Sequence, residues 1–206
     1  MVFAETNWIF DGVFKRDVNA EYMFELAQQD RIVMSIPRFA FAESRGQSEV
    51  VIQRRIDNIQ LALASLRELR RSRHRAEEAN QLITSLQEMI NQLKQELSIM
   101  QNLTEDIKLI CDIIPYDMEI QARARLRVIE RQPPFAENDS VIYESILWFA
   151  EQNQEIDLTM LFLTRNRRDF DYPHIYHELE ELGIELFFET GECVRRLREL
   201  LGFSEN

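Results

Sequence analysis

The sequence predicts an α/β fold in which helices cover a central parallel sheet and a long antiparallel helical hairpin is inserted. Short apolar segments of strand length alternate with helical patterns, an order that is typical of a parallel sheet. Residues 47–114 differ from the rest, because they contain neither Gly nor Pro and repeat apolar residues at steps of three and four. We therefore assign residues 1–46 and 115–206 to an α/β domain and residues 47–114 to the hairpin.

Strands of the α/β domain are expected where short apolar runs stop at polar residues or at Pro. These runs cover residues 2–4, 31–36, 160–163 and 184–188. Helical patterns lie between them at residues 17–29, 37–43, 139–151 and 173–182. The last helix has Pro173 in its first turn and Gly183 just past its end, which are the preferred places of these residues at helix termini.

The central segment is expected to form two helices, each with an apolar stripe. The stripes comprise Ile52, Ile56, Ile59, Leu63 and Leu66 in the first half and Leu82, Leu86, Met89 and Leu93 in the second. They are out of register, since fourteen residues beyond Leu66 the first stripe reaches Asn80. A hairpin that turns around residues 70–80 lets each coiled-coil-like helix cover the other's stripe. One unbroken helix would instead need a partner chain.

Five arginines and one histidine fall between residues 67 and 75, at the expected turn. A basic run of this kind is typical of RNA contact. A solvated tip, in which the arginines pair with Glu68, Glu77 and Glu78, explains it equally well. Both interpretations stay open at this point.

The composition excludes several classes of enzyme. Five glycines cannot be assembled into a dinucleotide-binding loop, a P-loop or a nucleophile elbow. The net charge is −12, and because residues 47–114 carry 9 basic and 10 acidic residues, the excess acid belongs to the α/β domain. Acidic proteins seldom bind nucleic acid. Proteins that gather carboxylates around divalent cations are the exception, since the bound metal reverses the local field.

The cysteines and the apolar pattern indicate where the protein resides. Cys111 and Cys193 form neither a C-x-x-C motif nor a disulfide framework, which favours a reducing compartment. The N-terminal residues do not have the pattern of a secretory signal. No apolar run approaches 18 residues, so we expect no membrane contact. The sequence therefore predicts a cytoplasmic protein.

Polar residues follow two of the expected strands, at the sheet edge where ligands bind in open α/β sheets. Glu5 follows the first strand and Asp169 follows a later one, while Glu43 and Asp139 fall in or near adjoining helices. Several carboxylates that converge there cannot all stay ionised without a cation. Hard oxygen ligands select Mg²⁺ or Mn²⁺.

Other residues compete for or support this role. Asp171 is a rival of Asp169, and Asp139 alone would be an ordinary helix N-cap. Beside Asp169, three arginines are candidates to hold substrate phosphates, namely Arg165, Arg167 and Arg168. His174 and His177, three residues apart on a helix near Glu178, are two-thirds of a possible zinc site, although solvated histidines are the ordinary case.

These motifs resemble the PIN domain, a family of metal-dependent nucleases that mostly cut RNA. The family typically opens with a strand ending in Asp-Thr-Asn, and the start Val2-Phe-Ala-Glu-Thr-Asn7 is similar. A helical Glu after a Pro-containing turn resembles Pro37 through Glu43, and an Asp opening a helix resembles Asn138-Asp139. The later strand followed by Thr-Arg-Asn-x-x-Asp-Phe resembles Thr164 through Phe170.

The resemblance implies a three-layer α/β/α fold and an acidic quartet that binds metal and catalyses. Its members would be Glu5, Glu43, Asp139 and Asp169, supported by the polar residues Thr6, Asn7 and Thr164. Glu5 stands where the family usually has Asp. The long helical middle would be an insertion.

The first functional hypothesis is a metal-dependent endoribonuclease that hydrolyses single-stranded RNA, as a toxin of a toxin–antitoxin pair or as a processing or defence nuclease. The alternative is a PIN-like protein without catalysis that binds a protein partner, or a second copy of itself, through the helical hairpin. Glu5 and the long insertion motivate this alternative. A third hypothesis keeps the metal site and changes the substrate to DNA.

Overall fold

The computed structural model describes residues 1–13, 16–72, 74–153 and 158–203. The chain divides into two compact units. Met1–Ser44 and Asp106–Asn206 form the first, here called the sheet unit, and Arg45–Glu105 form the second, here called the hairpin unit. Each unit is described by itself.

A parallel five-stranded sheet forms the centre of the sheet unit within the described residues. Its order is β3-β2-β1-β4-β5. The strands are β1 (Val2–Ala4), β2 (Met34–Pro37), β3 (Asp112–Ile114), β4 (Met160–Leu163) and β5 (Ile184–Phe187). The central position of β1 places residue 5 in the middle of the sheet's carboxyl edge.

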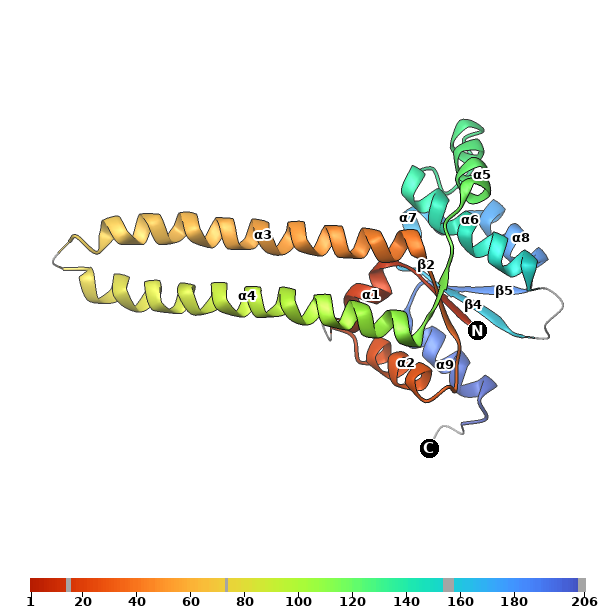
Figure 1. Cartoon of the computed structure of the whole chain (residues 1–206), viewed down its shortest axis with the longest axis horizontal. Coiled ribbons are helices and arrows are strands. Elements are labelled where there is room, and N and C mark those ends of the chain that lie inside the picture. The colour runs from red at the N-terminus through yellow and green to blue at the C-terminus, as the bar shows by residue number, and fades with distance from the viewer. Residues whose placement is uncertain (14–15, 73, 154–157, 204–206) are drawn as a thin grey trace. The chain divides into compact units, whose positions relative to one another are not determined.

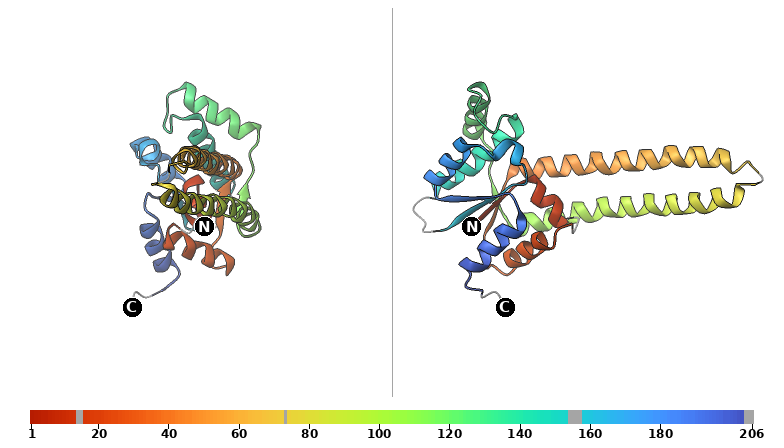
Figure 2. Two further views of the ribbon diagram at one scale, coloured as in Figure 1. Left: turned by 90° about the vertical axis from the view of Figure 1, so that its left-hand side faces the viewer. Right: turned by 180° about the vertical axis from the view of Figure 1, so that it is seen from behind.

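Helices cover both faces of this sheet (Figures 1 and 2). On one side lie α5 (Met118–Ile129), α6 (Glu137–Gln152) and α8 (Pro173–Glu181), and on the other α2 (Val18–Gln28) and α9 (Thr190–Leu200). Two short helices, α1 (Thr6–Val13) and α7 (Arg167–Phe170), directly follow the ends of strands. The predicted three-layer α/β/α fold is confirmed.

The strands form where they do because their side chains are buried on both faces of the sheet. Val2, Phe3 and Ala4 are fully buried, as are the neighbouring residues Met34 and Phe162. A strand buried on both faces has a continuous apolar sequence rather than an alternating one. Buried runs of this kind form β1, β2 and β4, although β2 begins three residues later than expected. β5 contains Glu185, and of its residues only Ile184 is buried.

β3 was not expected, since residues 112–114 were assigned to the hairpin. It pairs with β2 at the sheet edge, with Ile113 opposite Ile36. Only Ile114 among its three residues is fully buried. A three-residue edge strand after a long helix has too little apolar sequence to be recognised.

The hairpin unit contains most of two long helices, α3 (Arg38–Leu69) and α4 (Ala76–Ile110). Within this unit they run antiparallel and side by side (Figures 1 and 2). The turn between them falls at residues 70–75, inside the range expected for it. Ile52, Ile56 and Leu63 are buried on α3, in the predicted stripe.

The buried stripe of α4 differs from the predicted one. Leu82 and Met89 were placed in it, but they are 53% and 48% exposed. Leu93 of the predicted stripe is buried, but the other buried side chains in this part of α4 are Ala79 and Ile83. Both stripes repeat at steps of three and four, and the sequence offered no reason to prefer the one that begins at a small Ala over the one that begins at a Leu.

Both cysteines are free and buried. Burial raises the pKa of each thiol to about 12, in Cys111 and in Cys193 alike, which leaves them unreactive at neutral pH. Among the described residues, no helix combines the length and apolar character needed to cross a membrane.

Candidate active site

The register of the two central strands brings Glu5 beside Thr164. Ala4 lies opposite Leu163 in the parallel pair of β1 and β4, so the next residue of each strand extends past the same edge. The Thr164 hydroxyl donates to Glu5 Oε1 at 3.0 Å, and the Arg165 backbone N–H donates to the same oxygen at 3.3 Å. Asn7 Nδ2 donates to it at 2.7 Å.

These three donors hold a carboxylate that is almost completely buried. Glu5 is only 3% exposed. Burial is the main cause that raises its pKa, while the hydrogen bonds from Asn7, Thr164 and the Arg165 backbone oppose that rise, and the charge of Glu43 adds to it. Glu5 is therefore a fixed, buried carboxylate whose Oε1 accepts three hydrogen bonds, and burial raises its pKa despite them.

Glu43, near the start of α3, is joined to two other helices. The Thr6 hydroxyl in the first turn of α1 donates to Glu43 Oε2 at 2.8 Å. Asn138 Nδ2 in the first turn of α6 donates to Glu43 Oε1 at 3.0 Å. Each oxygen of this carboxylate thus has a protein donor, and the three helix starts are tied together.

The charges of the three other predicted carboxylates all act on Asp139. It lies in the first turn of α6 and is partly buried. Burial first, and then the charges of Asp169, Glu5 and Glu43, raise its pKa to about 6 against a hydrogen bond from Asn166. Like charges raise a pKa only when they lie near one another. The structure therefore brings all four predicted carboxylates into one neighbourhood.

The four carboxylates are of the ligand type that a divalent cation prefers, but they do not form a complete coordination shell in this structure. Within the described parts of the chain, no group of three or more His, Cys, Asp or Glu side chains has the geometry to hold a metal ion. Charges act over several ångströms, whereas Mg²⁺ needs oxygen ligands at about 2.1 Å. An all-oxygen, mutually repelling set of carboxylates fits the ligand chemistry of Mg²⁺ or Mn²⁺.

A family model described as a PIN domain matches residues 2–170. The chain belongs to the PIN-domain family. The matched range extends from β1 to the end of α7 and contains all four carboxylates as well as both hairpin helices. No curated protein and no solved structure matches the chain. PIN domains are generally nucleases that use divalent metals.

The three arginines beside Asp169 have different surroundings in this PIN domain. Arg165 Nη1 donates to Asp11 at 2.5 Å, and Asp11 is a buried residue of α1. Arg167 lies 4.6 Å from the ring centre of Phe188 and 3.6 Å from the carboxylate of Glu189. Two of the three expected phosphate ligands therefore already have partners within the protein.

Arg168 and Asp171 complete the segment around α7. Arg168 is exposed on this helix. Asp171, the rival of Asp169, accepts a hydrogen bond from the Tyr176 hydroxyl at 2.9 Å, and its charge is not among the causes that shift the pKa of Asp139. Asp169 is thus the member of the pair that faces the other carboxylates electrostatically.

The two histidines of α8 do not share a carboxylate. His174 lies 3.3 Å from Glu178, and His177 lies 3.5 Å from Glu181, each partner being four residues further along the helix. These are ordinary pairs on a helix surface. No zinc ligand set of three His, Cys, Asp or Glu side chains is found in the described residues.

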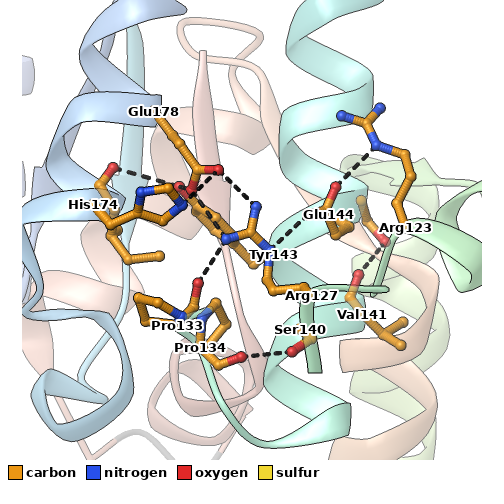
Figure 3. A network of polar contacts seen from close by, with 12 residues as sticks. Arg123, Arg127, Pro133, Pro134, Ser140, Val141, Tyr143, Glu144, His174 and Glu178 are labelled. Carbon is orange, nitrogen blue, oxygen red and sulfur yellow. Dashed lines mark hydrogen bonds and ion pairs between the residues drawn. The ribbon is translucent and has the colours of Figure 1, made fainter. Parts of the chain in front are cut away.

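A buried arginine supports the part of the PIN domain that carries Asp139 (Figure 3). Arg127 of α5 is 4% exposed, and its Nη1 donates to the Pro133 carbonyl at 2.6 Å. The Ser140 hydroxyl donates to the next carbonyl, that of Pro134, at 2.6 Å. These two bonds fix the connection into α6, which begins at Glu137 and carries Asp139 in its first turn.

Two carboxylates neutralise this arginine. Arg127 Nε donates to Glu144 at 2.7 Å, and its Nη2 donates to Glu178 at 2.8 Å (Figure 3). Burial opposes the charge of Arg127, but the bonds to Glu178 and the charge of Glu144 outweigh it and raise the pKa of the guanidinium. The ring of Tyr143 lies 4.9 Å from Arg127 Cζ. The charged group is fully compensated, as a buried ion must be.

Sequence reasoning missed several of these residues. The pairing of Arg165 with Asp11, and that of Arg127 with Glu144 and Glu178, joins residues 17 to 154 positions apart, and no local pattern marks such pairs. Glu178 was noted only beside the histidines of its own helix. Asn138 and Asn166 could have been predicted from the sequence, because each lies close to a predicted carboxylate in the PIN-like motifs.

Proposed function

We propose that this PIN domain is a metal-dependent endoribonuclease that hydrolyses phosphodiester bonds of single-stranded RNA. The observation that carries the proposal is the gathering of Glu5, Glu43 and Asp139 at one edge of the sheet by the contacts of Thr164, Thr6 and Asn138. There the charges of Asp169, Glu5 and Glu43 add to burial in raising the pKa of Asp139 to about 6. Mutual repulsion of this kind, at the carboxyl edge of a parallel sheet, is what a divalent cation relieves.

In this proposal Glu5, Glu43, Asp139 and Asp169 hold Mg²⁺ or Mn²⁺. A bound divalent cation lowers the pKa of a water and stabilises charge that develops on phosphate oxygens. Thr6 and Asn7 keep Glu43 and Glu5 in place through the bonds described above, and Thr164 supports Glu5 from the neighbouring strand.

The substrate phosphates are assigned to the arginines around α7. Arg168 is exposed and points to this role by its position beside Asp169. Arg165 is 54% exposed in its side chain although it is paired with Asp11, and Arg167 is similarly exposed at 55%. Both can therefore add a phosphate contact to the protein contacts that orient them.

The test is cleavage of end-labelled single-stranded RNA by the full chain with Mg²⁺, with Mn²⁺ or with EDTA. We expect metal-dependent cleavage by the parent protein and a loss of about 100-fold or more in Asp139→Asn, the scale of removing an electrostatic catalytic group. Asp171→Asn is the matched control, since it removes the same charge two residues from Asp169. The proposal is refuted if Asp139→Asn cuts as fast as the parent protein, or if EDTA has no effect. Cleavage of a DNA strand but not of RNA would favour the third hypothesis.

The alternative function, an interaction module without catalysis, is favoured by a separate observation on the hairpin unit. Apolar side chains on its helices are open to solvent, among them Leu61 at 70%, Leu82 at 53% and Ile99 at 54%. Such side chains are available to a protein partner or a second copy. Titration calorimetry with Mn²⁺ would then show no binding, and size-exclusion chromatography would show an assembly that Leu61→Lys and Leu82→Lys abolish.

We place the protein in the cytoplasm, because both of its thiols are free and buried. A toxin of a toxin–antitoxin pair, a processing nuclease and a defence nuclease all share the chemistry proposed here.

A further inference from the structure

The turn of the hairpin unit is strongly basic in a protein that is acidic overall. Residues 67–75 contain five of the 24 basic residues of a chain whose net charge is −12. Four of these arginines lie in the described residues, all four are exposed, and they are here called the arginine turn: Arg67, Arg70, Arg71 and Arg75. Arg73 lies outside the described residues.

The fold explains only part of this charge. Arg67 and Arg70 lie at the carboxyl end of α3, where a positive charge interacts favourably with the helix dipole. Arg75 directly precedes α4, where the same dipole disfavours a positive charge and where Glu77 and Glu78 already supply the favoured one. The hairpin would therefore fold as well or better without Arg75.

Pairing with acidic neighbours does not neutralise the turn either. Arg71 lies 3.4 Å from Glu68, but the two side chains are 80% and 72% exposed. Ion pairs this exposed contribute little to stability and are easily exchanged for another anion. The guanidinium groups of the turn are thus concentrated, hydrated and free to bind an anion of higher charge density.

We propose that the arginine turn binds the phosphate backbone of RNA without regard to base sequence. The identity of the ligand rests on the proposed function, because RNA is the polyanion on which that activity acts. Guanidinium groups form bidentate hydrogen bonds with phosphate oxygens. Most of the negative charge lies outside residues 47–114, so an RNA strand is repelled by the rest of the protein and attracted at the turn. The turn therefore supplies affinity that the carboxylate-lined site does not.

The test compares two double variants of the full chain with equal changes of charge. Arg67→Gln/Arg70→Gln removes two charges from the turn, and Arg54→Gln/Arg55→Gln removes two from exposed positions further back on α3. Binding of a fluorescently labelled single-stranded RNA is measured by anisotropy in EDTA, across a series of KCl concentrations. All four positions are exposed, and circular dichroism verifies that both variants keep the helical content of the parent protein.

Each phosphate contact that is lost should lower the salt dependence of log Kobs by about 0.7. That slope corresponds to about fivefold weaker binding per contact at about 0.1 M salt. We expect the turn variant to lose up to about 25-fold in affinity and about 1.4 in slope, and the control variant to bind like the parent protein.

The proposal is overturned if both variants bind RNA equally well, or if the parent protein itself does not bind. It is also overturned if the turn variant loses affinity for polyglutamate but not for RNA, which would identify an acidic protein as the partner. Asp139→Asn separates this proposal from the proposed function. If that variant keeps the parent's salt slope, RNA binding by the turn stands even where cleavage fails.

Discussion

Replacing Asp139 by Asn should make the protein more stable at neutral pH, although it removes a proposed catalytic group. Burial, with the charges of Asp169, Glu5 and Glu43, raises the pKa of Asp139 from 3.8 to about 6. An acid with a raised pKa in the folded state is penalised whenever it is ionised. The penalty is absent below pH 4, grows between pH 4 and 6, and is complete above pH 6. Stability should therefore fall as the pH rises through this window.

The size of the effect follows from the pKa. A rise from 3.8 to about 6 corresponds to about 3 kcal/mol, at 1.36 kcal/mol per unit. Because Asp139 is only partly buried, solvent screening reduces this to about 1–2 kcal/mol. Asn removes the charge and keeps an oxygen that can accept the bond from Asn166. We expect Asp139→Asn to raise the free energy of unfolding by about 1–2 kcal/mol at pH 8 and to change little at pH 4.

Urea unfolding in EDTA at the two pH values measures this difference. Trp8 and Trp148 both belong to the sheet unit, so tryptophan fluorescence reports the unfolding of the unit that contains Asp139. The midpoint should shift upward at pH 8 without a change in the m-value. Asp171→Asn is the control, since it removes a charge that is not among the named causes of the raised pKa of Asp139, although it also weakens a bond from Tyr176. A variant less stable than the parent at pH 8, or a shift of equal size at both pH values, would refute the repulsion on which the argument rests.

Two further substitutions test the packing of each unit. Arg127→Met should lower the free energy of unfolding by about 3 kcal/mol, because it leaves Glu144 and Glu178 without their buried partner. Arg123→Met should lower it less, since the side chain of Arg123 is 30% exposed. Urea unfolding followed by tryptophan fluorescence measures both variants. Leu63→Ala should cost the hairpin about 2–4 kcal/mol, because Leu63 is 4% exposed, while Leu61→Ala at a 70% exposed position should change stability by less than about 0.5 kcal/mol. Far-UV circular dichroism follows the hairpin, and equal effects at Leu61 and Leu63 would contradict the observed stripe.

The parts of the fold that could be predicted are those in which several consecutive residues are apolar and buried. β1, β2 and β4 are buried along their whole length, so their apolar runs identify them without further information. β3 has one fully buried residue and α1 begins directly after a strand, so neither has a pattern long enough to read. The phase of α4 was ambiguous for another reason. Two stripes with the same spacing coexist in its sequence, and only the contact with α3 selects Ala79 and Ile83 over Leu82 and Met89.

In the candidate site, the contacts set by the backbone could be predicted from the sequence, whereas the partners of long side chains could not. Glu5 and Thr164 are 159 residues apart, yet their contact follows from the strand register, because residues that leave parallel neighbouring strands emerge at one edge. Arg165 shows where such reasoning stops. Its backbone N–H donates to Glu5, as the register requires, but its side chain pairs with Asp11 on α1. A motif indicates the path of the backbone. The partner of a long side chain depends instead on every element within its reach, and those elements come together only in the complete fold.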